Sequence, residues 1–272
     1  MKKILSQLPA PVLAGVVREQ NAAAAIAEIR NCIYNGAGMI DLHLSCLEDS
    51  STKTLEGIVQ KCKLPILALN YNQTFTKANA GLSEEERVAS LLRAVDAGAA
   101  GIDMQGYTFD APSKSAFCGE DRYSFTAGKP KEVVTDPAVI EKQCALIEEV
   151  HAKGAEVLLS CHPGIHLNST QLVDLALFYE ERKPDMIKIV SIANTEEEML
   201  ESIKAMLLLK KEIKTPVTFH AGGKAGALTR IINPMLGGQI MFCVDHYKES
   251  STMDQLHLAT ARRIVDDLSK IL

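Results

Sequence analysis

The chain has 272 residues, of which 47% are hydrophobic and 23% are charged, so it is long enough to bury the core of one large domain. Its net charge of −5 at pH 7 argues against nucleic acid as the main partner, because nucleic-acid-binding proteins carry basic patches. The sequence has no long apolar stretch and no charged start that leads into an apolar segment. We therefore expect one domain over residues 1–272, in a cytoplasmic protein that binds no membrane.

Seven cysteines are scattered along the chain without a Cys-x-x-Cys pair. An odd number of cysteines in apolar surroundings is typical of reduced core thiols rather than of a disulfide framework. Cys161 stands beside a histidine and is therefore an alternative nucleophile, although a reactive thiol needs electropositive and accessible surroundings.

Short apolar runs alternate with longer amphipathic segments along the chain. The runs predict eight strands, at residues 12–17, 38–42, 65–69, 101–104, 156–159, 185–190, 217–220 and 239–242. Apolar residues at three- and four-residue spacing predict helices between them, among which are 21–34, 84–97, 139–153, 170–181, 196–211 and 253–271. Gly-Ala follows several of these helices, and we expect Gly36, Gly98 and Gly154 to be helix C-caps.

The repeated order of strand and helix predicts an α/β fold. Eight such repeats over about 250 residues match a (β/α)8 TIM barrel. The alternative is a doubly wound open sheet, but no Gly-x-Gly-x-x-Gly fingerprint follows Val17. The connection 106–136 after the fourth strand is unusually long. At the face where barrel active sites form, such a connection is more typical of a lid or a subunit contact than of a linker.

Lys188 is the strongest functional signal in the sequence, because it lies between Ile187 and Ile189 in the apolar run 185–190. Burial disfavours the ammonium and is expected to lower the lysine pKa toward neutrality. A neutral amine can form a Schiff base with a ketone. The alternative is a lysine on an edge strand that extends its amine to solvent.

Further polar residues stand at the predicted strand ends, where barrel enzymes place their catalytic groups. Strand alternation sends Asp41 and His43 to the same side of the sheet. His162 ends the fifth strand and has a pKa suited to proton transfer at neutral pH. Together with Lys188 on the next strand, His162 predicts one catalytic pair.

Metal binding is a competing use of the residues at the strand ends. The possible ligands are Asp41, His43, His162 and His220. Their spacing is not diagnostic of a metal site, and Lys188 at the centre would repel a cation. We therefore predict a site without a metal or a cofactor.

The loop after the seventh strand, residues 221–230, contains three glycines and could hold a phosphate through its backbone amides. It lacks the spacing of a P-loop. Arg230 at its end could bind a carboxylate or a phosphate with two parallel hydrogen bonds, or could be a surface arginine.

With these residues placed, the chain resembles type I 3-dehydroquinate dehydratases from about Pro11 to Leu258. The segment 160–162 resembles the family's Ser-x-His, and 186–189 resembles its lysine strand. Likewise 226–230 resembles Gly-x-x-Ser-Arg, and 251–255 resembles Ser-x-x-Gly-Gln. The resemblance implies that Lys188 forms an imine with the ring ketone of the substrate, and that His162 is the general acid/base.

The resemblance also implies that Arg230, Ser251 and Gln255 hold the substrate carboxylate. It further implies a hydro-lyase of the shikimate pathway of aromatic amino acid biosynthesis, with a small-molecule substrate and no cofactor. By analogy we expect a homodimer.

The first half of the chain departs from the family pattern. Asp41 and His43 stand where the family has Glu-x-Arg, Asn70 replaces its strand-three arginine, and Gln105 replaces the strand-four glutamate that assists the histidine. We expect these four residues to line the substrate pocket. Histidine and asparagine cannot supply the planar charged fork of an arginine. Without the carboxylate, the imidazole of His162 should also be less basic.

Three functions follow from the sequence. The first is a Schiff-base lyase that removes water from 3-dehydroquinate or a related hydroxy keto acid. The second is a class I aldolase, because the same lysine chemistry can break a carbon–carbon bond. The third is a ligand-binding protein that has the fold without turnover.

Overall fold

The computed structural model describes residues 4–71, 82–110, 132–248 and 255–271. The chain divides into two compact units, which we describe separately. The first comprises Met1–Asp103, Val150–Glu156 and Ile240–Leu272, and the second comprises Met104–Glu149 and Val157–Gln239. The prediction of one domain stays a prediction. The predicted lid or subunit contact at 106–136 falls mostly outside the described residues, which include only its two ends.

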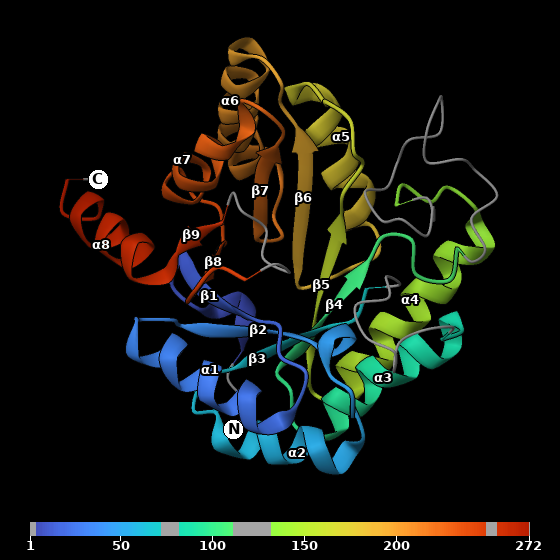
Figure 1. Ribbon diagram of the computed structural model, residues 1–272. Coiled ribbons are helices and arrows are strands. Elements are labelled where there is room, and N and C mark those ends of the chain that lie inside the picture. The colour runs from blue at the N-terminus through green and yellow to red at the C-terminus, as the bar shows by residue number, and fades with distance from the viewer. Residues whose placement is uncertain (1–3, 72–81, 111–131, 249–254, 272) are drawn as a thin grey trace. The chain divides into compact units, whose positions relative to one another are not determined.

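The first unit is built on parallel strands in the order β4-β3-β2-β1-β8-β9. Their bounds are β1 Val12–Val17, β2 Met39–His43, β3 Ile66–Leu69, β4 Gly101–Gln105, β8 Ile240–Val244 and β9 Leu256–His257. Its helices are α1 Ala22–Tyr34, α2 Thr52–Lys61, α3 Glu84–Asp96 and α8 Leu258–Leu268, with 3-10 turns at Leu5–Gln7 and Leu44–Cys46. Helices α1, α2 and α3 follow one another along this sheet (Figure 1).

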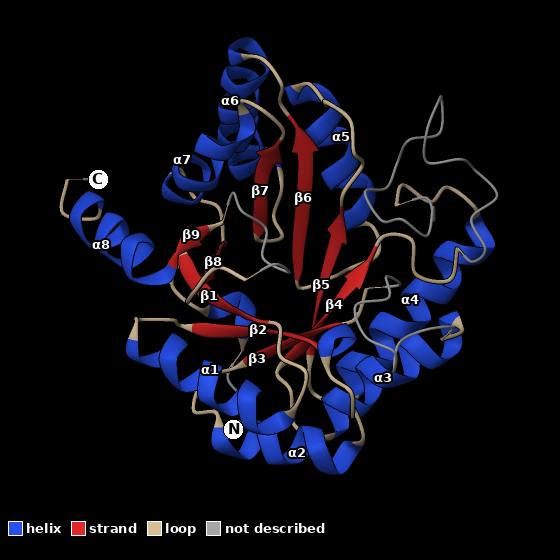
Figure 2. Ribbon diagram, in the orientation of Figure 1, coloured by secondary structure: helices blue, strands red, loops and turns tan. Residues whose placement is uncertain are grey.

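The second unit contains three parallel strands in the order β7-β6-β5. They are β5 Glu156–Cys161, β6 Met186–Ile192 and β7 Val217–Gly222. The helices are α4 Pro137–Ala152, whose last residues belong to the first unit, α5 Ser169–Glu180, α6 Glu196–Glu212 and α7 Thr229–Met235, with a 3-10 turn at Gly226–Leu228. Helices α5 and α6 pack together beside β6 and β7 (Figure 2).

Local sequence explains where the elements begin and end. The strands are buried nearly throughout, as expected for parallel strands with rows of apolar residues on both faces. Helix α3 begins at a capping box in which Ser83 and Glu86 satisfy each other's backbone amides. Gly36, Gly98 and Gly154 have φ values of 94°, 103° and 71°, which confirms them as C-caps in the left-handed region.

All eight predicted strands are confirmed, with ends that shift by no more than two residues. The predicted helix 253–271 is wrong at its start, because Leu256 and His257 form β9 beside Cys243 and Val244 of β8. Pairing with a neighbouring strand overrides the local helical pattern here. Helices α2 and α7 are not among the helix ranges given from the sequence, although the eight predicted strand–helix repeats allow for them.

Within the part of the chain that the structure describes, no helix combines the length and apolarity that a membrane crossing requires.

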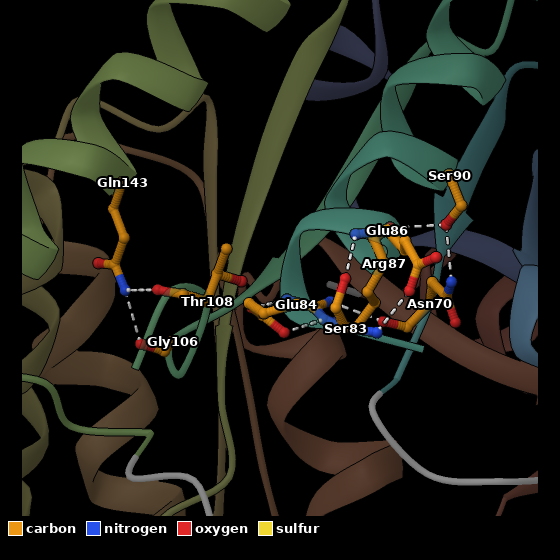
Figure 3. Close-up of polar contacts among 9 residues, drawn as sticks. All are labelled: Asn70, Ser83, Glu84, Glu86, Arg87, Ser90, Gly106, Thr108 and Gln143. Carbon is orange, nitrogen blue, oxygen red and sulfur yellow. Dashed lines mark hydrogen bonds and ion pairs between the residues drawn. The ribbon is translucent and has the colours of Figure 1, made fainter. Parts of the chain in front are cut away.

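An arginine is buried at the end of β3. Arg87 of α3 is 2% exposed, and its Nη1 donates to the backbone oxygen of Asn70 at 2.7 Å. Its Nε and Nη2 donate to the two carboxylate oxygens of Glu84 at 2.8 and 2.6 Å. Figure 3 shows this fork together with the Asn70 side chain, which donates to Ser90 of α3 at 2.6 Å. The guanidinium is therefore occupied in joining α3 to the end of β3.

We predict that Arg87→Ala lowers the free energy of unfolding by about 3 kcal/mol, because removing one partner of a buried ion pair leaves the other charge uncompensated. Chemical denaturation measures this difference. Arg262→Ala is the matched control, because the Arg262–Asp266 pair of α8 is about half exposed and should contribute about 0.5 kcal/mol or less. Equal losses in both variants would contradict the structural role of Arg87.

Candidate active site

Three neighbouring strands of the second unit bring the predicted catalytic pair, Lys188 and His162, to one face together with His220, a possible metal ligand in the sequence analysis. Lys188 of β6 lies directly across from Ser160 of β5 and Thr218 of β7. His162 and His220 follow two residues after those partners. Since side chains two residues apart point to the same side of a strand, both imidazoles share the face of the lysine. Lys188, His162 and His220 are 6%, 7% and 6% exposed, so this face is almost closed to solvent.

His162 is held by a carboxylate that the sequence analysis missed. Its Nδ1 lies 3.1 Å from Oε2 of Glu132, and its backbone N–H donates to the same oxygen. Glu132 is fully buried and lies shortly before α4. The Nδ1 contact fixes the ring orientation, so that Nε2 remains for proton transfer.

The expectation that His162 lacks an anionic partner is therefore wrong. It rested on Gln105, which replaces the family's strand-four glutamate and lies fully buried at the end of β4. The carboxylate comes instead from a residue beyond the long connection. No periodic pattern surrounds Glu132 in the sequence, and the only signal is an acidic residue placed before two valines and a helix start.

A buried network holds the backbone around Glu132. The Tyr179 hydroxyl donates to the Glu132 backbone oxygen, and Arg182 donates to the Val134 oxygen at 3.0 Å and to Gln143 Oε1 at 2.9 Å. The Gln143 amide in turn donates to the backbone oxygens of Gly106 and Thr108 at 2.8 and 2.9 Å (Figure 3). The two described ends of the long connection are thereby tied to α4 and to the end of α5.

Electrostatics keep both histidines neutral. Burial lowers the pKa of His162 well below its usual value, and the positive charges of Lys188 and Arg230 lower it further. Glu132 opposes this shift, since a carboxylate stabilises the imidazolium form, but burial and two cations outweigh it. The pKa of His220 is also lowered well below its usual value by burial, then by Arg230, Lys188 and His162. A neutral imidazole can accept a proton, so His162 is suited to act as a base.

Cys161 is not the nucleophile of this site. The thiol is fully buried, and burial, with the nearby Glu132 carboxylate, raises its pKa well above the usual value. The residue therefore stays a thiol at neutral pH, whereas thiolate is the reactive form.

Arg230 is the second residue of α7 and is half-buried. The neighbouring Thr229 hydroxyl accepts the Ala221 N–H at 2.8 Å and donates to Gly226 O at 2.6 Å, which fixes the loop that leads to Arg230. The amides of Lys224 and Ala225 donate to Asn194 Oδ1 and Ala193 O. These bonds argue against the alternative of a phosphate held by amides of 221–230.

The remaining predicted site residues lie mostly in the first unit. His43 Nε2 is 3.2 Å from Asp41 Oδ2, which confirms that these two side chains share a side, and the His43 ring lies 5.9 Å from that of Tyr71. Asn70 is bound to Ser90 of α3. Gln255 is buried, and Ser251 lies outside the described residues. Their predicted roles in binding substrate stay predictions.

A different group of residues approaches the geometry of a metal site. Among the described residues, Glu19, Glu28 and His246 are the set whose ligand atoms lie within 4.8 Å of one another. His246 Nδ1 is 3.2 Å from Glu28, and the Lys248 amine contacts Glu19. These ion pairs within the chain already account for the cluster.

The family model for type I 3-dehydroquinase matches residues 132–271, which is about half of the chain. This chain belongs to the type I 3-dehydroquinase family. The matched part includes Glu132, His162, Lys188, His220 and Arg230. In contrast, Asp41, His43 and Asn70 lie before it.

Curated relatives match over a similar length. The 3-dehydroquinate dehydratase of Alkaliphilus oremlandii is 30% identical over 131 residues, which cover 46% of this chain and 49% of the relative. That of Klebsiella pneumoniae is 26% identical over 141 residues, covering 51% of this chain and 54% of the relative. The chain thus matches about half the length of these relatives.

Solved structures of the family share the fold. Type I 3-dehydroquinate dehydratase from Clostridium difficile has a TM-score of 0.74 at 15% identity, over 97% of this chain and 94% of that one. The enzyme from Geobacillus kaustophilus has a TM-score of 0.73 at 14% identity, over 99% and 97%. This likeness confirms the predicted fold class, the α/β arrangement of a TIM barrel.

We predict that Gly106→Ala destabilises the protein by about 1–3 kcal/mol, because an added Cβ would overlap the Glu132 backbone oxygen and the Tyr179 hydroxyl. Thermal and chemical denaturation measure the loss. Gly57→Ala is the control, since a Cβ at Gly57 in α2 meets no atom and should stabilise the helix by up to about 1 kcal/mol. A Gly106→Ala variant as stable as the parent would show that the backbone does not approach so closely.

Proposed function

We propose that this protein is a Schiff-base hydro-lyase that removes water from 3-dehydroquinate or a closely related hydroxy keto acid. The observation that carries the proposal is the buried Lys188 on β6, with His162 directly after the neighbouring β5 and its Nδ1 bound to Glu132. The matched family model supports it, as do curated relatives named 3-dehydroquinate dehydratase. The enzyme from Clostridium difficile was solved with covalently modified comenic acid.

The mechanism uses Lys188 as the nucleophile. The Lys188 ammonium first gives up a proton, and the amine attacks the substrate ketone. Return of one proton and loss of one water then leave an iminium that withdraws electrons from the adjacent carbon. The neutral His162 then takes a proton from that carbon, which converts the iminium into an enamine. The enamine electrons expel the hydroxyl one carbon further on, and His162 returns its proton so that the group leaves as water. Hydrolysis of the imine releases the conjugated ketone and restores the lysine.

Substrate binding is the role we propose for the other residues. Arg230, with Ser251 and Gln255, would hold the substrate carboxylate, because a guanidinium binds a carboxylate through two parallel hydrogen bonds. Asp41, His43, Asn70 and Gln105 would face the hydroxyl groups. Arg87 is not available for this purpose, since Glu84 and Asn70 occupy its donors.

We propose a cytoplasmic location from the sequence and, by analogy with the family, a homodimer. Light scattering coupled to size-exclusion chromatography would measure the mass of the assembly in solution, and twice the mass of one chain is the expected result.

We predict that borohydride treatment with 3-dehydroquinate leaves a stable adduct on Lys188, and that Lys188→Ala abolishes both the adduct and the conjugated product. Intact-mass spectrometry and absorbance measure the two. Lys204→Ala, at an exposed position of α6, is the control and should behave like the parent protein. An adduct with two carbonyl fragments would indicate an aldolase. Substrate binding without any adduct would indicate the ligand-binding alternative.

We predict that Glu132→Gln lowers kcat at least about 10-fold, because a positioned acid/base group contributes about 10²–10⁴-fold to a rate. Loss of the carboxylate removes an anionic contact that favours the imidazolium, so the pKa of His162 falls further. The acid limb of the pH–rate profile should therefore move to lower pH. Glu148→Gln, exposed on α4, is the control. An unchanged rate, or a limb that moves to higher pH, would exclude this role.

A further inference from the structure

A second histidine flanks Lys188 from the strand opposite His162. His220 on β7 pairs with Val190, which follows two residues after Lys188 on β6. His162 follows two residues after Ser160, the β5 partner of Lys188. With strands about 4.8 Å apart and a rise of about 3.3 Å per residue, each histidine Cα lies roughly 8 Å from that of the lysine. Two imidazoles therefore stand on the two sides of one amine, at the same height along the strands.

The surroundings of His220 differ from those of His162. Its side chain is buried, yet the His220 ring shows no hydrogen bond to any residue within the described ranges, whereas His162 has Glu132. Buried polar side chains nearly always have a hydrogen-bond partner. A ring that faces the lysine and has no hydrogen-bond partner among the described residues is suited to a partner that arrives with the substrate. Its burial, and then the nearby Arg230, Lys188 and His162, lower the pKa of His220 well below its usual value.

The proposed reaction needs proton transfers at two separate places. One is the carbon and hydroxyl of the substrate, where water is eliminated. The other is the nitrogen of Lys188 and the oxygen of the ketone, where the imine forms and is hydrolysed. We infer that His220 is a second catalytic residue, which carries the protons of imine formation and hydrolysis while His162 serves the elimination. This inference rests on the proposed function.

Imine formation through His220 needs no further proton donor or acceptor. His220 takes one proton from the Lys188 ammonium and becomes imidazolium, and the free amine forms a bond to the ketone carbon while the carbonyl electrons move to oxygen. A proton passes from nitrogen to that oxygen and gives a carbinolamine. The imidazolium then protonates the carbinolamine hydroxyl, the carbon–oxygen bond breaks, and water leaves. The nitrogen lone pair completes the iminium, and His220 is neutral again.

The test is the rate of adduct formation with 3-dehydroquinate, measured by rapid mixing, borohydride quench and intact-mass spectrometry. His220→Gln and His220→Asn retain hydrogen bonding but cannot carry a proton. We expect both to slow adduct formation by about 10²-fold. His162→Gln should instead form the adduct rapidly and accumulate it. His151→Asn, exposed on α4, is the matched control and should equal the parent protein.

Added imidazole separates catalysis from a structural effect. It should restore adduct formation in His220→Ala, where the missing ring leaves space, and a merely structural role would not respond. Adduct formation at the parental rate in a His220 variant overturns the inference, as does a defect confined to the elimination. If the parent protein forms no adduct, the proposed function fails, and the inference fails with it. An adduct in the parent protein with unaffected His220 variants refutes the inference alone.

Discussion

The buried carboxylate of Glu132 is the interaction on which the rest of the site depends. Lys188 and Arg230 act electrostatically on His162, and all three come from the same unit. Buried positive charge is costly without a counter-charge, and a protonated histidine between two cations would be more costly still. Glu132 supplies that counter-charge and orients the imidazole. Tyr179, Arg182 and Gln143, which hold the segment around Glu132, are therefore necessary to this geometry as well.

Glu132 places a carboxylate beside His162 although Gln105 stands where the family has its strand-four glutamate. Gln105 ends β4, and the next residue, Gly106, donates its N–H to the Ser160 oxygen at 2.7 Å. Because Gly106 has no side chain, the Glu132 backbone can approach it closely. The carboxylate of Glu132, 27 positions after Gln105 in the chain, thus reaches His162.

The strands could be predicted from the sequence because each is an apolar run of a length that few helices have, bounded by glycine or proline. The catalytic roles of Lys188 and His162 could be predicted because a lysine is rare inside an apolar run and because the strand order places the two residues on neighbouring strands. The role of Glu132 could not be predicted, because it lies in a long connection, where the sequence has no helical or strand periodicity. His220 was visible only as one possible metal ligand, because its significance depends on the register of β7 against β6. The start of α8 was missed for the same reason, since β9 exists through its pairing with β8.

The buried thiol of Cys161 limits which reagents can react with this site. Peroxide and most electrophilic probes react with thiolate, and oxidation follows thiolate character and exposure. Cys161, adjacent to His162, is fully buried and remains protonated, so it has neither thiolate character nor exposure to solvent. In the proposed mechanism the nucleophile is Lys188, so oxidants that inactivate enzymes with a cysteine nucleophile should not inactivate this site. A covalent inhibitor of that mechanism would have to carry a carbonyl group for the lysine rather than an electrophile for the sulfur.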